Sequence, residues 1–198
     1  MTYRSIKSFT LAALIGTLVV PGAFASMPMH RHADEKPAAK PAAAQTLMDA
    51  AYSRSKKEKK PVLVMFHATW CGWCKRLQKV LDVPEFKKMV DSNYVVVHVD
   101  VMERGEEKDK SENDGGVKLM TDLGGEKSGL PFYAILDASG KKLADSNALP
   151  GNQNIGYPGS PEEIKAFIKL LKDTAPKLSA GQLDKFGLYL KEHAPATH

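Results

Sequence analysis

The sequence predicts an α/β domain whose central mixed sheet is flanked by helices. Residues 62–67 and 94–99 are mainly apolar and rich in β-branched side chains, and a helical pattern lies between them, so these two strands should pair in parallel. Residues 132–136 and 141–145 flank a turn at 137–140, which is typical of an antiparallel hairpin. A βαβ unit followed by a hairpin gives a mixed sheet.

Segments with the apolar spacing of a helix lie before and after the first strand in the sequence. A first helix is expected over residues 47–60, where apolar side chains recur at intervals of three and four before a proline. A second should cover 74–81 and break at Pro84, with a further turn over 85–90. Both should pack against the sheet.

Two longer connections join the strands and helices of the second half. Residues 102–116 are highly charged and contain glycine, so we expect a solvated loop or a short helix there. One short helix should follow over 117–123. Residues 146–159 are rich in Asn, Gly and Pro and are expected to form an ordered loop without regular structure.

The C-terminal part is predicted to be helical. Ser160, followed by a proline and by Glu163, has the pattern of a capping box at the start of a helix. A last amphipathic segment, 183–190, lies within a helical extension at about 179–193. We expect this extension to pack on the outside of the domain.

The N-terminus has the pattern of a secretory signal peptide over residues 1–25. Arg4 and Lys7 precede an apolar stretch, 9–20, and Ala23-Phe24-Ala25 then forms a cleavage motif. The apolar part is short for a bilayer span, although an uncleaved N-terminal anchor is the alternative. We therefore expect a periplasmic protein, exported by a cleavable signal, that is not stably inserted in the membrane afterwards.

A flexible tether should separate this signal from a single domain. Residues 26–43 are rich in Ala, Pro, His and Lys and cannot bury enough apolar surface to fold, which leaves 44–198 as the domain. The formal net charge of the chain is +5, and no block of Lys and Arg is interleaved with aromatic residues. Nucleic acid is therefore not an expected partner.

The two cysteines of the chain both lie in Cys71-Gly72-Trp73-Cys74, directly after the first strand. The disulfide that the molecule can form within itself therefore joins Cys71 to Cys74. A bridge across so short a loop removes little entropy from the unfolded chain, so it would stabilise the fold only weakly. Such a pair is suited to opening and closing, so redox chemistry is the leading hypothesis.

The predicted positions of the two thiols suggest different roles for them. Cys71 would lie at a helix N-terminus, where unpaired N–H groups and the helix dipole favour a thiolate. Cys74, one turn further on, would be shielded from solvent. We therefore expect Cys71 to attack a partner disulfide from outside and Cys74 to resolve the mixed disulfide from inside.

The order of elements and three motifs resemble the thioredoxin-like superfamily over about residues 44–174. The motifs are the strand at 61–66, the sequence from Trp70 to Lys75, and Gly129-Leu130-Pro131-Phe132 before the hairpin. The resemblance implies a thioredoxin-like fold in which Pro131 is cis and faces the cysteines. It also implies that the backbone of Leu130 meets an extended peptide.

Four residues around the cysteines are further candidates for substrate contact or support: Trp70, Gly72, Trp73 and Lys75. The two tryptophans flank the attacking sulfur. They would either form an apolar rim for a protein substrate or simply pack, and the sequence leaves both alternatives open.

The chain departs from thioredoxins proper at two places. Met65 occupies the position, six residues before the first cysteine, where those proteins have a buried Asp that assists the second cysteine. Gly72-Trp73 lies between the cysteines, so no histidine there stabilises a Cys71 thiolate and a strongly oxidising potential is disfavoured. Residues 82–86 and 102–128 resemble the bacterial periplasmic thioredoxin-like proteins that group with the reductase domain of an electron-relay family.

These features predict an exported thiol-disulfide oxidoreductase that reduces protein disulfides. In an oxidising compartment such a reductase needs an upstream membrane electron donor. No cofactor and no metal are expected. The alternatives are a disulfide oxidase or isomerase, a non-catalytic binding or chaperone module, and a zinc site that would add His67 and His98 to the two cysteines.

Overall fold

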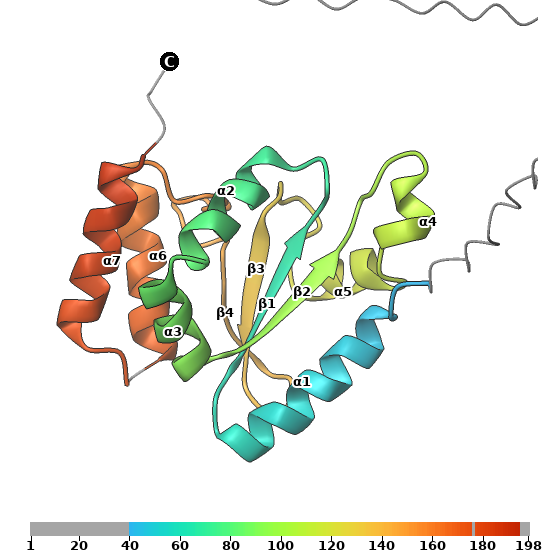
Figure 1. The fold of residues 1–198 in the computed structure, drawn as a ribbon, viewed down its shortest axis with the longest axis horizontal. Helices are drawn as coiled ribbons and strands as arrows, with labels where there is room; N and C mark the ends of the chain where they lie inside the picture. The colour runs from blue at the N-terminus through green and yellow to red at the C-terminus, as the bar shows by residue number, and fades with distance from the viewer. Residues whose placement is uncertain (1–39, 176, 195–198) are drawn as a thin grey trace, which may run out of the picture. The chain divides into compact units, whose positions relative to one another are not determined.

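Four strands form one mixed sheet in the computed structural model, which describes residues 40–175 and 177–194 (Figure 1). The strands are β1 (Val62–His67), β2 (Val95–Asp100), β3 (Phe132–Leu136) and β4 (Lys142–Asp145), and their order in the sheet is β2-β1-β3-β4. β1 pairs in parallel with β2 and antiparallel with β3, which in turn pairs antiparallel with β4. The predicted mixed sheet is confirmed.

One face of the sheet is covered by α1 (Ala44–Glu58) and α5 (Gly116–Asp122), with the short α4 (Glu107–Ser111) beside them (Figure 1). Every second residue of β1, namely Val62, Val64 and Phe66, is buried in this core together with Met48 of α1. β1 is central and apolar on both faces because helices cover it on both sides.

The other face carries four helices: α2 (Gly72–Leu81), α3 (Pro84–Asn93), α6 (Pro161–Thr174) and α7 (Ala180–Glu192) (Figure 1). Their apolar residues meet Leu63 and Met65 of β1 and Tyr133 and Ile135 of β3 in a second core. The predicted capping box of α6 is present, with Ser160 and Glu163 each accepting from the other's backbone N–H.

One expectation about these helices needs correction. The turn expected over 85–90 is a full helix, α3, because Pro84 occupies its first turn and its fixed φ suits a helix start. The C-terminal helix α7 packs on the outside of the domain beside α6, as expected, and its apolar face joins the core (Figure 1). Phe186 and Leu190 are completely buried, and the Phe86 and Phe186 rings stack with their centroids 4.5 Å apart.

The expected signal peptide and residues 26–39 of the expected tether lie outside the described residues. Within the described part of the chain, no helix has the length and apolar character that crossing a membrane requires. At the N-terminal edge of the fold, the backbone carbonyl of Ala42 accepts from Asn113 Nδ2 at 2.8 Å, and the Ala44 N–H donates to the Asp114 carbonyl.

Tyr94 links the end of α3 to α6 and generates the first prediction. Its buried hydroxyl lies 2.7 Å from Thr174 Oγ1, and burial raises its pKa to about 12. Tyr94→Phe should lower the free energy of unfolding by about 1 kcal/mol at neutral pH. Tyr133→Phe is the matched control, because the buried Tyr133 hydroxyl has no partner among the described residues and its loss should not destabilise.

The stability difference between wild type and Tyr94→Phe should also depend on pH. The unfolded tyrosine ionises near pH 10 and the folded one near the raised pKa, so the contribution of Tyr94 is complete below about pH 10 and is lost above it. Urea unfolding of both proteins at about pH 7 and about pH 11 measures this. A difference that stays constant with pH would contradict it.

Candidate active site

The two cysteines form a disulfide at the start of α2. Cys71 is the N-cap residue of the helix, and its Sγ accepts a hydrogen bond from the Cys74 N–H at 3.1 Å. Their Cα atoms are 5.3 Å apart. Cys71 therefore lies where the unpaired N–H groups of a helix meet the positive end of its dipole, which favours a thiolate once the bridge is reduced.

The expected contrast in exposure between the two cysteines is wrong. Cys71 is 4% exposed and Cys74 is 7% exposed, so Cys71 is no more open to solvent than its partner. The reason is that both cysteines form one small buried cluster with Ala68, against which Leu130 packs. Gly72 leaves open space beside them, since a Cβ placed on it would meet no atom within 4 Å. The position on the helix, rather than exposure, distinguishes the two thiols.

Trp70 and Trp73 are both exposed and both anchored, at 42% and 52%. Trp70 Nε1 donates to the Met102 carbonyl at 2.7 Å, and the guanidinium of Arg104 lies 3.9 Å from the centre of a Trp70 ring. Trp73 stacks on Tyr157 with ring centroids 5.7 Å apart. Each tryptophan thus packs on one side and leaves apolar surface beside the disulfide on the other.

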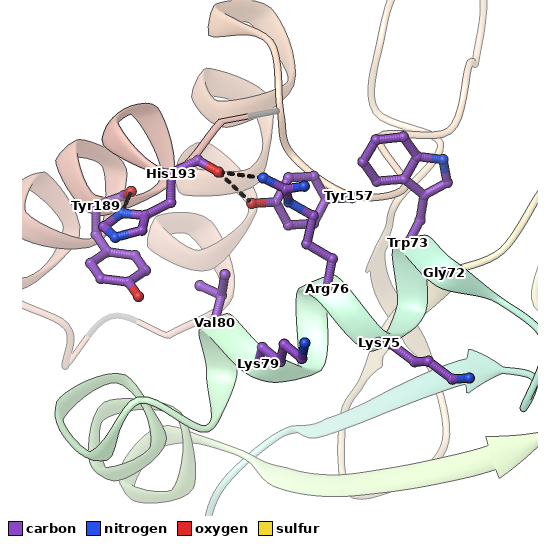
Figure 2. A pocket seen from close by; sticks show the side chains of 9 residues that line it. All are labelled: Gly72, Trp73, Lys75, Arg76, Lys79, Val80, Tyr157, Tyr189 and His193. Atoms are coloured by element: carbon purple, nitrogen blue, oxygen red, sulfur yellow. Dashed lines mark hydrogen bonds between the residues drawn. The ribbon is translucent and has the colours of Figure 1, made fainter. Parts of the chain in front are cut away.

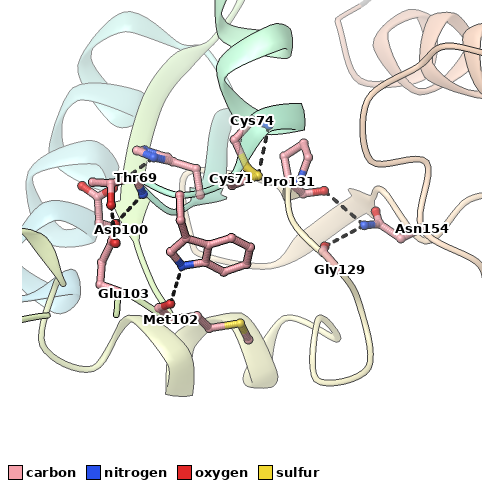
Figure 3. The surroundings of a disulfide bond; sticks show 11 residues. Thr69, Cys71, Cys74, Asp100, Met102, Glu103, Gly129, Pro131 and Asn154 are labelled. Carbon is pink, nitrogen blue, oxygen red and sulfur yellow. Dashed lines mark hydrogen bonds and ion pairs between the residues drawn. A yellow bond between two sulfur atoms is a disulfide. The ribbon is translucent and has the colours of Figure 1, made fainter. Parts of the chain in front are cut away.

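Glu103 fixes the loop that leads into Cys71, a role that the sequence did not indicate. Its carboxylate accepts from the Thr69 N–H and from Thr69 Oγ1, both at 2.6 Å (Figure 3). Its own N–H donates to Glu112 Oε2 at 2.8 Å. Glu103 is 6% exposed although it lies in the segment that was expected to be solvated. Composition alone carries no signal that separates it from the exposed acids around it.

The loop before β3 approaches the disulfide from the opposite side. The Leu130-Pro131 peptide bond is cis. Asn154 holds this loop, because its Nδ2 donates to the Gly129 carbonyl at 2.8 Å and to the Pro131 carbonyl at 3.1 Å (Figure 3). Asn154 belongs to the 146–159 loop, which runs without regular structure apart from one isolated bridge, and the sequence did not mark it as a site residue.

Behind Cys74, the end of the sheet carries polar side chains. His67 Nδ1 lies 3.0 Å from Asp100 Oδ1, and the His67 and His98 rings meet edge to face at 5.2 Å. The pKa of His98 is lowered, first because the surrounding protein removes water from the ring and second because of the charge of the nearby His67. Met65, on the same face of β1, is buried in the core. Lys75 is exposed on α2.

The zinc alternative finds no support in this geometry. Both cysteine sulfurs are committed to a disulfide. Among residues 40–175 and 177–194, no group of three or more His, Cys, Asp or Glu side chains is arranged to hold a metal ion. His67 is instead paired with Asp100.

Comparisons with known proteins agree with this geometry. Residues 43–138 match a family model described as thioredoxin-like. A protein disulfide-isomerase of Triticum aestivum is 27% identical over 133 residues, which are 65% of this chain and 20% of that protein. The chain thus spans about a fifth of the length of this curated relative.

Two solved structures of bacterial proteins are also similar to this chain, with lower sequence identity than the Triticum aestivum protein. A disulphide isomerase from Xylella fastidiosa Temecula1 is 22% identical with a TM-score of 0.45, over 84% of this chain and 99% of that chain. The oxidised C-terminal domain of DsbD from Neisseria meningitidis is 25% identical with a TM-score of 0.41, over 54% of this chain and 84% of that chain.

The role of Glu103 can be tested by stability. Glu103→Ala should lower the free energy of unfolding by about 1–3 kcal/mol, because the Thr69 N–H and hydroxyl lose a buried charged acceptor. Glu106→Ala is the matched control, since Glu106 is exposed and, among the described residues, its carboxylate pairs with Lys110 alone at the surface, so its loss should cost less than about 0.5 kcal/mol. Denaturant unfolding of the oxidised proteins measures both. Equal effects of the two substitutions would refute the anchoring role.

Proposed function

Residues 43–138 of this chain are a thioredoxin-like domain, and we propose that the protein is a thiol-disulfide oxidoreductase that reduces disulfides of other proteins. The observation that carries the proposal is the Cys71–Cys74 disulfide at the N-terminus of α2, with the Leu130-Pro131 loop packed against it. A pair placed there can open, attack and close again without rearranging the fold.

The reaction begins from the reduced protein. The Cys71 thiolate, favoured by the start of α2, attacks one sulfur of a substrate disulfide. A new S–S bond joins Cys71 to the substrate, and the substrate's own S–S bond breaks, so that its second sulfur leaves with the electron pair and takes up a proton.

Cys74 completes the exchange. After losing its proton, its sulfur attacks Cys71 Sγ, the Cys71–Cys74 bond forms, and the bond to the substrate breaks. The substrate leaves with two thiols and this protein is left oxidised. Each cycle therefore consumes two electrons, and an upstream dithiol donor must return them. We propose a membrane-bound donor, because the signal-like residues 1–25 favour export to an oxidising compartment.

The surface around the disulfide suits an extended polypeptide. The backbone N–H and C=O of Leu130 make no hydrogen bond with any described residue, so they are free to pair with a substrate strand. The exposed faces of Trp70 and Trp73 lie beside the motif and supply apolar contact. Gly72 leaves room for the approaching chain.

A groove continues from the motif along α2. Figure 2 shows Trp73, Arg76 and Tyr157 together on this side of the helix, with Arg76 Nη2 donating to the His193 carbonyl at 2.9 Å. The groove has a volume of about 690 Å³, and Lys75 and Lys79 also line it. Its aromatic and cationic lining supports a protein substrate rather than a small disulfide alone.

Isomerase or oxidase activity is the second candidate, favoured by the curated wheat relative, which is a protein disulfide-isomerase. Reduction is preferred because Gly72-Trp73 places no histidine between the cysteines to stabilise a Cys71 thiolate strongly. The two activities also differ in what they require. Isomerisation can proceed by attack and release at Cys71 alone, whereas net reduction needs Cys74.

Cys74→Ala separates these possibilities. The variant should retain Cys71 as a nucleophile but fail to release the substrate, so mixed disulfides should accumulate on Cys71 and reductase turnover should fall by at least about 100-fold. Trapped adducts are identified by mass spectrometry after non-reducing electrophoresis. Cys71→Ala, which removes the attacking thiol, is the control and should capture nothing.

Two outcomes would change the conclusion. If Cys74→Ala keeps full activity in rescuing a scrambled disulfide protein, isomerisation is the function. If both variants suppress aggregation of an unfolded protein as well as wild type does, and neither captures a partner, the domain is a binding module without thiol chemistry.

A further inference from the structure

A cavity beside Cys74 contains a histidine and a carboxylate that the exchange reaction described above does not use. It has a volume of about 580 Å³ and lies between α2 and the carboxyl ends of β1 and β2. The lining residues that matter here are Cys74, Lys75 and Lys79 from α2, His67 from β1, and His98 and Asp100 from β2.

The strand register places His67 beside Asp100. In the parallel β1–β2 ladder, His67 is the partner of Asp100, and both side chains lie on the face of the sheet that α2 covers. His67 Nδ1 is 3.0 Å from Asp100 Oδ1. A carboxylate at this distance attracts the ring proton to Nδ1, which leaves Nε2 as the nitrogen that can accept another.

Nε2 of His67 is the unusual atom. It is buried and has no hydrogen-bond partner among the described residues. A buried polar atom without a partner is costly, and in a redox protein it is a reason to look for a chemical role. Here the atom belongs to a basic ring in the wall of the cavity that also contains Cys74.

Cys74 needs such a base. The thiol must lose its proton before it attacks Cys71, and burial against Ala68 and Leu130 disfavours the thiolate. Met65, on the same face of β1, is apolar and cannot accept a proton. Cys74 also lies one turn further from the helix N-terminus than Cys71, so it gains less from the dipole.

We propose that His67, held by Asp100, accepts the proton of Cys74 in the resolving step and returns it when the disulfide is reduced. The inference rests on the proposed oxidoreductase function. The S–H bond of Cys74 breaks as an N–H bond forms on Nε2 of His67. The freed electron pair on sulfur then makes the Cys71–Cys74 bond as the bond between Cys71 and the substrate breaks, and the substrate sulfur leaves with that bond's electron pair and takes up a proton from solvent. Asp100 is a positioning residue that orients the His67 ring through Nδ1.

Other charged or titratable groups lie near His67 and Asp100. Lys75 and Lys79 on α2 line the cavity and are cations that favour a Cys74 thiolate. His98 on β2 contacts the His67 ring, and its lowered pKa keeps it largely neutral. Glu103 is the further carboxylate in this region, and Thr69 occupies both of its oxygens. His67 is thus the histidine of the cavity with a carboxylate at Nδ1.

The test is a single turnover of the reduced protein with an aromatic disulfide that releases a coloured thiol. The first thiol reports attack by Cys71, and the second reports resolution by Cys74. His67→Gln should leave the first phase unchanged and slow the second at least about tenfold at about pH 7. The difference between the variant and wild type should narrow as the pH rises, because hydroxide can then take the Cys74 proton without a protein base.

Two further variants make the result decisive. Asp100→Asn should slow the second phase in the same direction but less, because it leaves the imidazole in place. His98→Gln is the matched control: it removes the other imidazole of the cavity and should leave both phases and their pH dependence as in wild type.

Three results would overturn the inference. The first is a second phase in His67→Gln with the rate and pH profile of wild type. The second is an equal slowing in His98→Gln, which would assign the effect to the polarity of the cavity. The third is loss of the first phase in His67→Gln, which would make the residue structural. A wild-type protein that releases no thiol at all would instead refute the proposed function, and the inference with it.

Discussion

The antiparallel register of β1 and β3 is the constraint on which the site depends. Phe66 pairs with Phe132, so the chain leaves β1 towards the cysteines at the same edge of the sheet where it enters β3 from Leu130-Pro131. Both phenylalanines are completely buried, and their rings lie 5.8 Å apart. A slip of one residue would turn each β3 side chain to the other face, which makes this register costly to change. The disulfide and its facing loop are therefore held together by the core.

Three polar side chains at this end of the sheet make the contacts that hold the site in place. Glu103 fastens the segment before Cys71, Asn154 fastens the loop before β3, and Asp100 faces His67 across the parallel ladder. These anchors come from two separate stretches of the chain, residues 100–103 and the loop that contains Asn154. The opening and closing of one S–S bond can thus take place on a rigid frame, which is what exchange chemistry at a fixed helix N-terminus requires.

Much of this could be predicted from the sequence because the relevant signals are local. The apolar run of β1, the proline that separates α2 from α3, and the capping box of α6 each act within a few residues. The cysteine motif points to the proposed chemistry for the same reason. The anchors were missed because Glu103 and Asn154 act over about 20 to 35 residues of separation and look like ordinary loop residues. The burial of Cys71 was missed because it depends on how Leu130 packs, which only the register of β3 determines.

The central claim is that the Cys71–Cys74 bond opens and closes as a two-electron couple with reducing character. Equilibration of the protein in dithiothreitol buffers of graded ratio, followed by alkylation and mass analysis, measures this directly. The account predicts a single two-electron transition with a midpoint nearer to that of thioredoxin, about −270 mV, than to that of the strong periplasmic oxidases, about −120 mV. A midpoint close to the oxidases, or cysteines that do not titrate as one pair, would contradict it.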